Sequence, residues 1–276
     1  MTSTVDRLVD SVRALPSIPQ ALQEVLDTLN NEEANVNDIV EPLSRDMALT
    51  LKVLRMANAA HFGLQKQVAS IDDAIHLVGL NAVRTMVISS GLMGAFDDIP
   101  GFDMKRFWRL SLLSALIGRD IAKQCAAHPE QAYTATLMHG LGVLALHRAF
   151  PEECQQIDRK CHDITPQDRA LCEMDGIGIH HGLVGAEIAK KWNLPEAVAQ
   201  AIKDYAFPEL QSTKMSLIAF VATAFAIDLE DKKDTDDLGS GVAPYVYSGL
   251  GCHREQLLNM AERWTDYRTS TDLLVS

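Results

Sequence analysis

The sequence predicts an all-α fold, and three observations support this class. Apolar residues recur with the spacing of one helix face, as in Leu22, Val25 and Leu26. Helix start signals recur along the chain, and Ser70 followed three residues later by Asp73 is typical of a capping box. Hardly any stretch alternates apolar and polar residues as a half-buried strand does. The hydrophobic side chains are therefore expected to lie between helices.

The N-terminal third of the chain is predicted to form a group of short helices. Pro19 suits the first turn of a helix, where its missing N–H is not needed. Gly63 and Gly79 are stop signals. Helices are predicted over residues 4–14, 19–30, 37–44, 46–59, 70–78 and 81–95. The segment 97–101, which contains Pro100, then separates this group from the helices that follow.

Longer helices are predicted after this break. Thr165, with Asp168 three residues on, repeats the capping-box pattern, and Pro195 begins another helix. Helices are predicted over residues 103–127, 129–148, 151–160, 166–175, 180–192, 195–205, 212–229 and 253–268. The segment 231–251 combines a dense run of charges with glycines and a proline, and we expect it to be a mobile loop.

Composition bounds the class of protein and its partners. The 276 residues are 47% hydrophobic and 22% charged, which is enough for one large domain or two small ones and excludes a disordered or fibrous chain. Lys and Arg number 25 against 37 Asp and Glu, giving a formal net charge of −12. Because no part of the chain is basic enough to hold a phosphate backbone, no nucleic-acid partner is expected.

Cysteine usage and the N-terminus predict where the protein resides. The five cysteines are scattered and form no Cys-x-x-Cys pair, so a reduced, cytosolic protein is expected. The first residues lack the apolar core of a signal peptide. The longest apolar stretch, 215–229, is shorter than the roughly 20 residues that a membrane-spanning helix needs. The sequence therefore predicts a cytoplasmic location and no membrane partner.

Three passages, taken in order, resemble one known family. The first consists of LPSIP (15–19), VLRMANAA (53–60), SIDDAI (70–75) and VGL (78–80). The second consists of FWRLSL (107–112) and LMHGLG (137–142). The third consists of HGLVGA (181–186), WNLP (192–195) and AI (201–202). Together they resemble the HDOD family, the HD-related output domain of bacterial signalling proteins, over about residues 15–207.

The resemblance implies a compact, multi-helix domain that is distantly related to the HD phosphohydrolases. It implies an N-terminal helical part to about residue 98, an HD-like part from about 102, and a C-terminal helical extension over 208–276. HD enzymes hold divalent metals with a His on one helix, a His-Asp pair on the next and a further His or Asp. These groups acidify a bound water and neutralise the phosphate. In HDOD proteins such hydrolysis is generally thought to be lost.

The residues at the corresponding positions of this chain make a poor metal site. Leu110 stands at the first His position, the His-Asp pair reads His139 and Gly140, and His181 keeps a third position. Two imidazoles without a carboxylate suit a hard divalent metal badly. We therefore predict no catalytic residue, no metal site and no cofactor, and a residual pocket lined by His139 and His181. The plainer interpretation makes each histidine a hydrogen-bonded core residue.

Two functions follow from this comparison. The first is a non-enzymatic regulatory module that binds a signalling protein or a small ligand in trans, in a groove between the N-terminal helices and the HD-like part. The alternative is a metal-dependent phosphohydrolase of a nucleotide or phosphodiester, which would need a divalent metal and carboxylates from other positions, such as Asp120 or Glu187. The sequence leaves open whether the protein is an enzyme.

Two further residues carry structural expectations. Asn58 lies in an otherwise apolar run, so its amide is expected to hold the backbone of the loop that follows. His180 and His181 are neighbours in one predicted helix, so their side chains point about 100° apart. One of these two histidines is therefore expected on the surface.

Overall fold

The computed structural model describes residues 18–28, 35–58, 68–96, 99–160, 165–209, 212–231 and 233–274. Every regular element within these ranges is a helix, which confirms the all-α class. The helix predicted over residues 4–14 lies outside the described ranges. None of the helices in the described ranges is long and apolar enough to cross a membrane.

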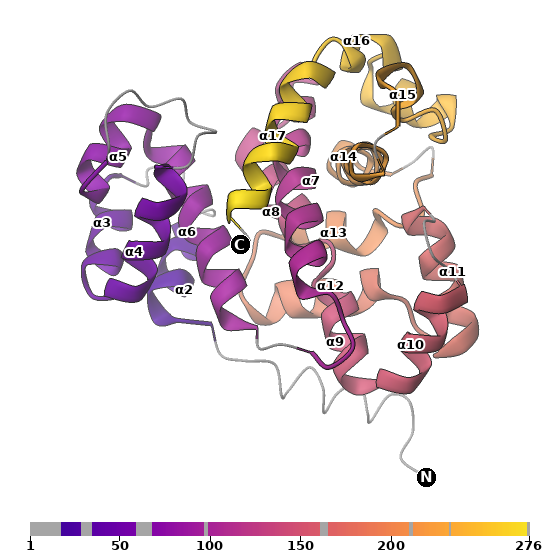
Figure 1. The fold of residues 1–276 in the computed structure, drawn as a ribbon, viewed down its shortest axis with the longest axis horizontal. Coiled ribbons are helices and arrows are strands. Elements are labelled where there is room, and N and C mark those ends of the chain that lie inside the picture. Colours follow the sequence, from indigo (N-terminus) through magenta and orange to yellow (C-terminus); the bar gives the residue numbers. More distant parts are fainter. Residues whose placement is uncertain are drawn as a thin grey trace.

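The first helices form a group of their own, drawn in indigo and purple in Figure 1. This N-terminal helical group consists of α2 (Gln20–Asp27), α3 (Asn37–Ser44), α4 (Met47–Ala57), α5 (Ile71–Val78) and α6 (Leu80–Ala95). Helices α2, α4 and α5 pack on α6. The predicted stripe of Leu22, Val25 and Leu26 is fully buried there. Ser70 accepts a hydrogen bond from the N–H of Asp73, as predicted for the start of α5.

Asn58 fastens the chain after α4, as its position in the sequence predicts. Its Nδ2 donates to the carbonyl oxygen of Val68 at 2.8 Å, and the N–H of Val68 donates to its Oδ1 at 2.7 Å. The side chain thus replaces a pair of backbone partners across ten residues. Asn58 therefore fixes the position of the backbone just before α5 begins.

The second group, which we call the HD-like part, surrounds one long helix. It consists of α7 (Met104–Gln124), α8 (Pro129–Met138), α9 (Leu141–Ala149), α10 (Pro151–Lys160), α11 (Pro166–Gly176), α12 (His181–Lys191), α13 (Glu196–Asp204) and α14 (Lys214–Glu230). Helices α8 and α14 pack along α7, and α12 packs between α9 and α13. Thr165 and Asp168 form the predicted capping box of α11.

The two groups share one hydrophobic core. Phe96, just after α6, packs its ring 6.1 Å from that of Trp108 and 6.2 Å from that of Trp192. The Ser89 and Tyr133 hydroxyls lie 2.6 Å apart between α6 and α8. Residues 97 and 98, at the predicted break, lie outside the described ranges. The N-terminal helical group thus packs directly against the HD-like part.

The single helix predicted over 129–148 is two helices in the structure. Helix α8 ends at Met138 and α9 begins at Leu141, so the chain turns at His139 and Gly140. A Cβ at Gly140 would lie only 2.7 Å from the Phe107 ring of α7. A Cβ at Gly142 would lie 1.9 Å from the carbonyl oxygen of His181, so α9 and α12 touch backbone to backbone. These close approaches depend on tertiary packing, which helical periodicity does not report.

The C-terminal region differs from the prediction in three ways. It contains η3 (Thr235–Asp237), α15 (Pro244–Leu250), α16 (Arg254–Leu258) and α17 (Ala261–Leu274), so the single helix predicted over 253–268 is two helices. Helix α15 lies inside the segment predicted to be a loop, because Pro244 begins it and Gly251, at φ 73°, ends it. Mobility of the remaining segment stays a prediction. Helix α14, which the prediction placed in a C-terminal extension, packs along α7 within the HD-like part.

Helix α17 returns to the HD-like part and covers α7 (Figure 1). Trp264 Nε1 and the Tyr267 hydroxyl donate to Asp120 Oδ2 at 3.3 and 3.0 Å. Asp120 is buried. The last helix therefore supplies the hydrogen-bond donors that this carboxylate needs inside the protein.

The cysteines meet the prediction in part. Cys125, Cys154 and Cys252 are free thiols and buried. Cys172 is disulfide-bonded, so the expectation of a fully reduced chain is wrong for this residue.

Candidate functional site

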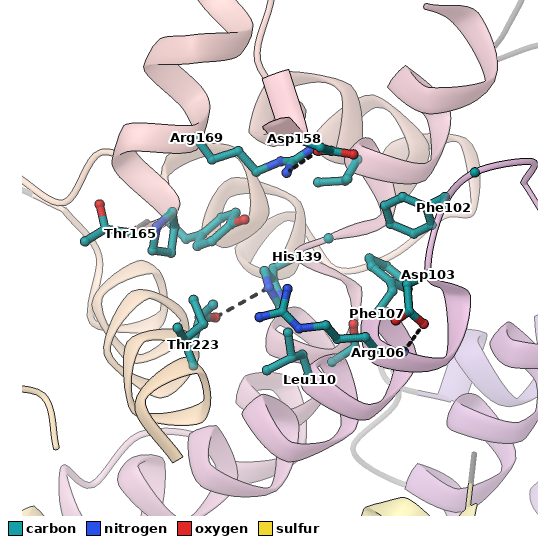
Figure 2. Close-up of a pocket in the computed structure, with 17 residues that line it drawn as sticks. Phe102, Asp103, Arg106, Phe107, Leu110, His139, Asp158, Thr165, Arg169 and Thr223 are labelled. Atoms are coloured by element: carbon teal, nitrogen blue, oxygen red, sulfur yellow. Dashed lines mark hydrogen bonds and ion pairs between the residues drawn. The ribbon is translucent and has the colours of Figure 1, made fainter. Parts of the chain in front are cut away.

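A cavity of about 370 Å³ opens in the middle of the HD-like part. Its wall is formed by Gly101, Phe102, Asp103, Arg106, Phe107, Leu110, Ser111, His139, Gly140, Val143, Asp158, Thr165, Pro166, Arg169, Tyr205, Thr223 and Ile227. These residues come from α7, the α8–α9 turn, α9, α10, α11, α14 and the connections beside them, including Tyr205 directly after α13 (Figure 2). The wall includes no residue of the N-terminal helical group. This cavity therefore does not lie in the groove that we expected between the two groups.

The cavity lies at the positions where the HD comparison places metal ligands. Leu110 lines it from α7, and His139 and Gly140 line it from the turn between α8 and α9. Thr223 faces His139 from α14, with 3.5 Å between its Oγ1 and His139 Nε2 (Figure 2). The helices around the HD centre are thus in place, while Leu110 and Gly140 stand at two of its ligand positions.

His139 is a buried, neutral imidazole. Its Nδ1–H donates to the carbonyl oxygen of Thr136, which leaves Nε2 as the acceptor. The Thr223 hydroxyl already donates to the carbonyl oxygen of Ala219 at 2.8 Å. Burial lowers the pKa of His139 to about 4. At neutral pH His139 therefore presents a hydrogen-bond acceptor, Nε2, to the cavity and carries no charge.

His181 does not reach the cavity. Its Nδ1 lies 2.6 Å from Glu173 Oε2, and its Nε2 lies 2.5 Å from the Tyr205 hydroxyl. Tyr205 lines the cavity and packs its ring 4.9 Å from that of His139 and 5.4 Å from that of His181. Of the two histidines predicted to line one pocket, His139 is therefore on the wall, and His181 lies behind Tyr205.

His180 also departs from the prediction. It is buried, like His181, and it precedes α12 as its N-cap. Its Nδ1 accepts a hydrogen bond from the N–H of Gly182 at 3.2 Å. The expectation that one of the pair lies on the surface is wrong because the helix begins between them, so they do not share one helix face.

A chain of ionic hydrogen bonds runs from α9 to α12 and passes along the cavity wall at Asp158 and Arg169. His147 Nε2 lies 2.8 Å from Asp158 Oδ2, and Arg169 Nη1 donates to Asp158 Oδ1 at 3.0 Å. Arg169 Nε donates to Glu173 Oε1 at 2.9 Å. Glu173 Oε2 then accepts from both the Nδ1 and the backbone N–H of His181. We call these five residues the ionic chain.

The ionic chain favours the charged form of its two carboxylates, although Glu173 is buried and Asp158 is half-buried. Burial tends to raise the pKa of Glu173, but the charges and hydrogen bonds of His181 and Arg169 outweigh burial and lower that pKa. The pKa of Asp158 is lowered in the same way, against burial, by His147 and Arg169. Each carboxylate thus has the paired partners that a buried charge requires.

Comparison with known proteins identifies the family. The HDOD domain family matches residues 15–207. The chain belongs to the HDOD family. Its HD-like helices and the cavity between them are therefore an HDOD version of the HD centre.

Relatives of this HDOD chain support the fold. A crystal structure of a candidate phosphohydrolase from Shewanella amazonensis SB2B is similar to it at 28% identity and a TM-score of 0.76, covering 96% of this chain and 98% of that one. An HDOD domain protein of unknown function from Geobacter sulfurreducens is similar at 22% identity and a TM-score of 0.75, covering 97% and 98%. An uncharacterized protein of Treponema pallidum is 27% identical over 230 residues, which are 81% of this chain and 44% of that protein. The chain thus spans less than half of this relative's length.

The residues at this HDOD site do not fit a divalent metal. His139 Nε2 is one available donor, whereas both ring nitrogens of His181 are engaged with Glu173 and Tyr205. No group of three or more His, Cys, Asp or Glu side chains is placed to hold a metal anywhere in the described ranges. A catalytic metal needs about three protein ligands and an open position.

The two carboxylates that the phosphohydrolase hypothesis requires lie elsewhere. Asp120 is held by α17, and Glu187 is exposed and forms an ion pair with Lys190 at 2.8 Å. Neither residue is part of the cavity wall. Neither Asp120 nor Glu187 can therefore supply a carboxylate ligand at the cavity for the phosphohydrolase alternative.

Sequence reasoning missed Glu173, Arg169 and Tyr205. Arg169 and Glu173 stand four residues apart on a predicted helix, where such a pair is usually a solvent-exposed ion pair. The one usable signal is that Glu173 shares its helix face with buried Ala170. Tyr205 gave no local signal, because its role depends on contacts with residues 24 and 66 positions away.

Proposed function

We propose that this HDOD chain is a non-enzymatic regulatory module of signal transduction, which binds a small ligand in the cavity and responds through a partner protein in trans. One observation carries the proposal. The HD-type cavity is retained with a volume of about 370 Å³, while Leu110 and Gly140 line it where metal chemistry needs donors. Pockets of such volume, lined mostly by apolar groups with a few polar ones, are typical of small-ligand sites.

The ionic chain supports the regulatory part of the proposal. Arg169 is both a wall residue and a member of the ionic chain. Its partner Glu173 accepts from the first backbone N–H of α12 at 2.7 Å. A ligand that moves Arg169 therefore moves the carboxylate that caps α12. Because buried charges tolerate no vacant partner, such a shift changes the packing of α11 against α12.

The first experiment separates this proposal from the phosphohydrolase alternative. Metal content is measured by elemental mass spectrometry on protein purified without chelator, and hydrolysis of p-nitrophenyl phosphate and bis(p-nitrophenyl) phosphate is followed with added manganese. We expect substoichiometric metal and no turnover. Stoichiometric metal, with turnover that His139→Ala abolishes and Glu187→Ala leaves intact, would contradict the non-enzymatic function.

The second experiment tests ligand binding itself. Ligand-observed NMR with a library of small fragments is run on the wild type and on Leu110→Trp, in which the larger side chain fills the cavity. Ile227→Trp fills it from α14 and replaces the first variant if that one fails to fold. We expect a set of fragments that bind the wild type and not the filled variant. If no fragment distinguishes the two, the cavity is not a ligand site.

A further inference from the structure

Two guanidinium groups reach into the cavity from opposite sides (Figure 2). Arg106 projects from α7, and Arg169 projects from α11. Arg106 has a long ion pair, with 3.9 Å between its Nη2 and Asp231 Oδ1. Arg169 Nη2 is buried and has no hydrogen-bond partner within the described residues. A buried donor of this kind costs free energy until an acceptor meets it.

The carboxylates of the same wall already have partners. Asp103 Oδ1 accepts from the N–H of Arg106 at 2.9 Å as the N-cap of α7. Asp158 is held by His147 at 2.8 Å and by Arg169 at 3.0 Å. His139 adds no charge. Apart from the hydroxyls of Ser111, Thr165, Tyr205 and Thr223, the polar groups that the wall offers a ligand are the arginine donors, which favour an anionic acceptor.

One part of the wall is apolar and partly aromatic. Phe102 and Phe107 lie with their ring centroids 5.7 Å apart, and Leu110, Val143 and Ile227 line the cavity as well. A volume of about 370 Å³ is near the lower end of the range for ligand pockets, so the occupant is a small molecule. An anionic group at the arginines would leave its body against these side chains.

We infer that the cavity takes a small organic anion, with a carboxylate or phosphate group between Arg106 and Arg169 and an apolar or aromatic body against Phe102, Phe107 and Leu110. This inference rests on the proposed ligand-binding function and specifies the chemistry of its ligand. It adds to that function a charge requirement that a fragment library alone does not test.

Thermal unfolding with four matched probes tests the charge requirement. Phenyl phosphate and benzoate carry the two candidate anionic groups on an aromatic ring, while benzyl alcohol and benzylamine carry a neutral and a cationic group. All are used at equal concentration and at ionic strength matched with sodium chloride. For at least one anion at about ten times its Kd, we expect a Tm rise of about 3 °C. The stronger of the two anions identifies the preferred group.

Three variants locate the effect. Arg106→Gln should remove most of the Tm rise, because it deletes one of the two guanidinium groups on the cavity wall. Leu110→Trp should abolish the rise by filling the cavity, with Ile227→Trp as the second filling variant. Arg45→Gln is the matched control, since this arginine is paired with Glu24 in the N-terminal helical group, away from the cavity. It should keep the full rise.

The outcomes separate this inference from the proposed function. If neither anion raises Tm, or if Arg106→Gln and the wild type respond equally, the anion inference is wrong. If benzyl alcohol or benzylamine binds instead and Leu110→Trp abolishes that binding, the anion inference fails while the cavity remains a ligand site. If no probe acts and the fragment experiment is also negative, both fail.

Discussion

Helices α2–α6 and helices α7–α14 bury different polar groups. Within the described residues, the buried polar side chains of the N-terminal helical group carry only hydroxyls, namely Thr28, Thr85, Ser89 and Ser90. The HD-like part buries carboxylates and imidazoles as well, among them Glu173, His139 and His181. A buried hydroxyl is satisfied by one nearby carbonyl, as when Thr28 donates to Val25 at 2.6 Å. A buried charge requires a partner on another element.

We infer from this difference that the N-terminal helical group supports the fold, whereas the HD-like part carries the candidate site. The N-terminal helical group is built as packing, in which an apolar face and local hydrogen bonds suffice. The HD-like part accepts the cost of desolvating charges, and it does so in the ionic chain beside the cavity. Strongly perturbed titratable groups gather at sites more often than at packing surfaces. The comparison therefore places the functional residues in the HD-like part, and four measurements can break or sharpen it.

The largest effect is expected from the ionic chain. Glu173→Ala leaves Arg169 and His181 buried without their carboxylate and should lower the free energy of unfolding by about 3–5 kcal/mol. Chemical denaturation measures this loss. Glu187→Ala is the control, because its ion pair with Lys190 is exposed and should contribute little. A small loss for Glu173→Ala would mean that the ionic chain is not what holds α11 to α12.

The next effect concerns the backbone contact between α9 and α12. A Cβ at Gly142 would lie 1.9 Å from the carbonyl oxygen of His181, so Gly142→Ala should cost about 1–3 kcal/mol by overpacking. Gly241, around which an added Cβ meets nothing within 4 Å, provides the matched Gly241→Ala control. Equal denaturation midpoints for the two variants would show that the two helices can separate without cost.

The third effect is a pH dependence carried by His139. The pKa of His139 is about 4 in the folded chain against about 6.5 for an unperturbed histidine, so the unfolded chain binds a proton at higher pH than the folded chain does. Stability is therefore full above pH 6.5 and is lost toward pH 4, by about 2 kcal/mol between pH 7 and pH 5. His139→Asn should lose that much less over this interval in denaturation measured at both pH values. Parallel pH profiles for the two proteins would contradict the buried, neutral state of His139.

The smallest effect tests the N-terminal helical group. Asn58→Ala removes both hydrogen bonds to Val68 and should cost about 1 kcal/mol. Asn37→Ala, at an exposed position of the same group, is the control and should be near neutral. Denaturation midpoints measure both variants. A cost as large as that of Glu173→Ala would erase the contrast between the two regions.

Local signals in the sequence predicted the helix starts well. Thr165 forms the predicted capping box, and Ser70 caps α5 by accepting from the N–H of Asp73, because each interaction needs only residues three positions apart. The turn at Gly140 was missed, since the reason for it is the Phe107 ring of another helix. Helix α15 was missed because the charges and glycines before Pro244 outweighed its short apolar face.

The candidate site was predicted only as far as single positions allow. Family resemblance identified His139 as a position of interest, and the structure places it on the cavity wall. The separation of His139 from His181 depends on Tyr205, and the state of His181 depends on Glu173. Both are contacts between helices. A sequence pattern reports the face on which a residue lies, and it does not report which helix that face meets.

The hydrogen bonds from α17 to Asp120 bear on the order in which the chain folds during its synthesis. A ribosome releases α7 long before the residues that carry Trp264 and Tyr267, so Asp120 waits without its two donors through most of synthesis. The N-terminal helical group can pack during that time, since its partners are close in sequence. The HD-like part reaches its final packing last, and a chain cut short before α17 would leave the Asp120 carboxylate on α7 without these donors.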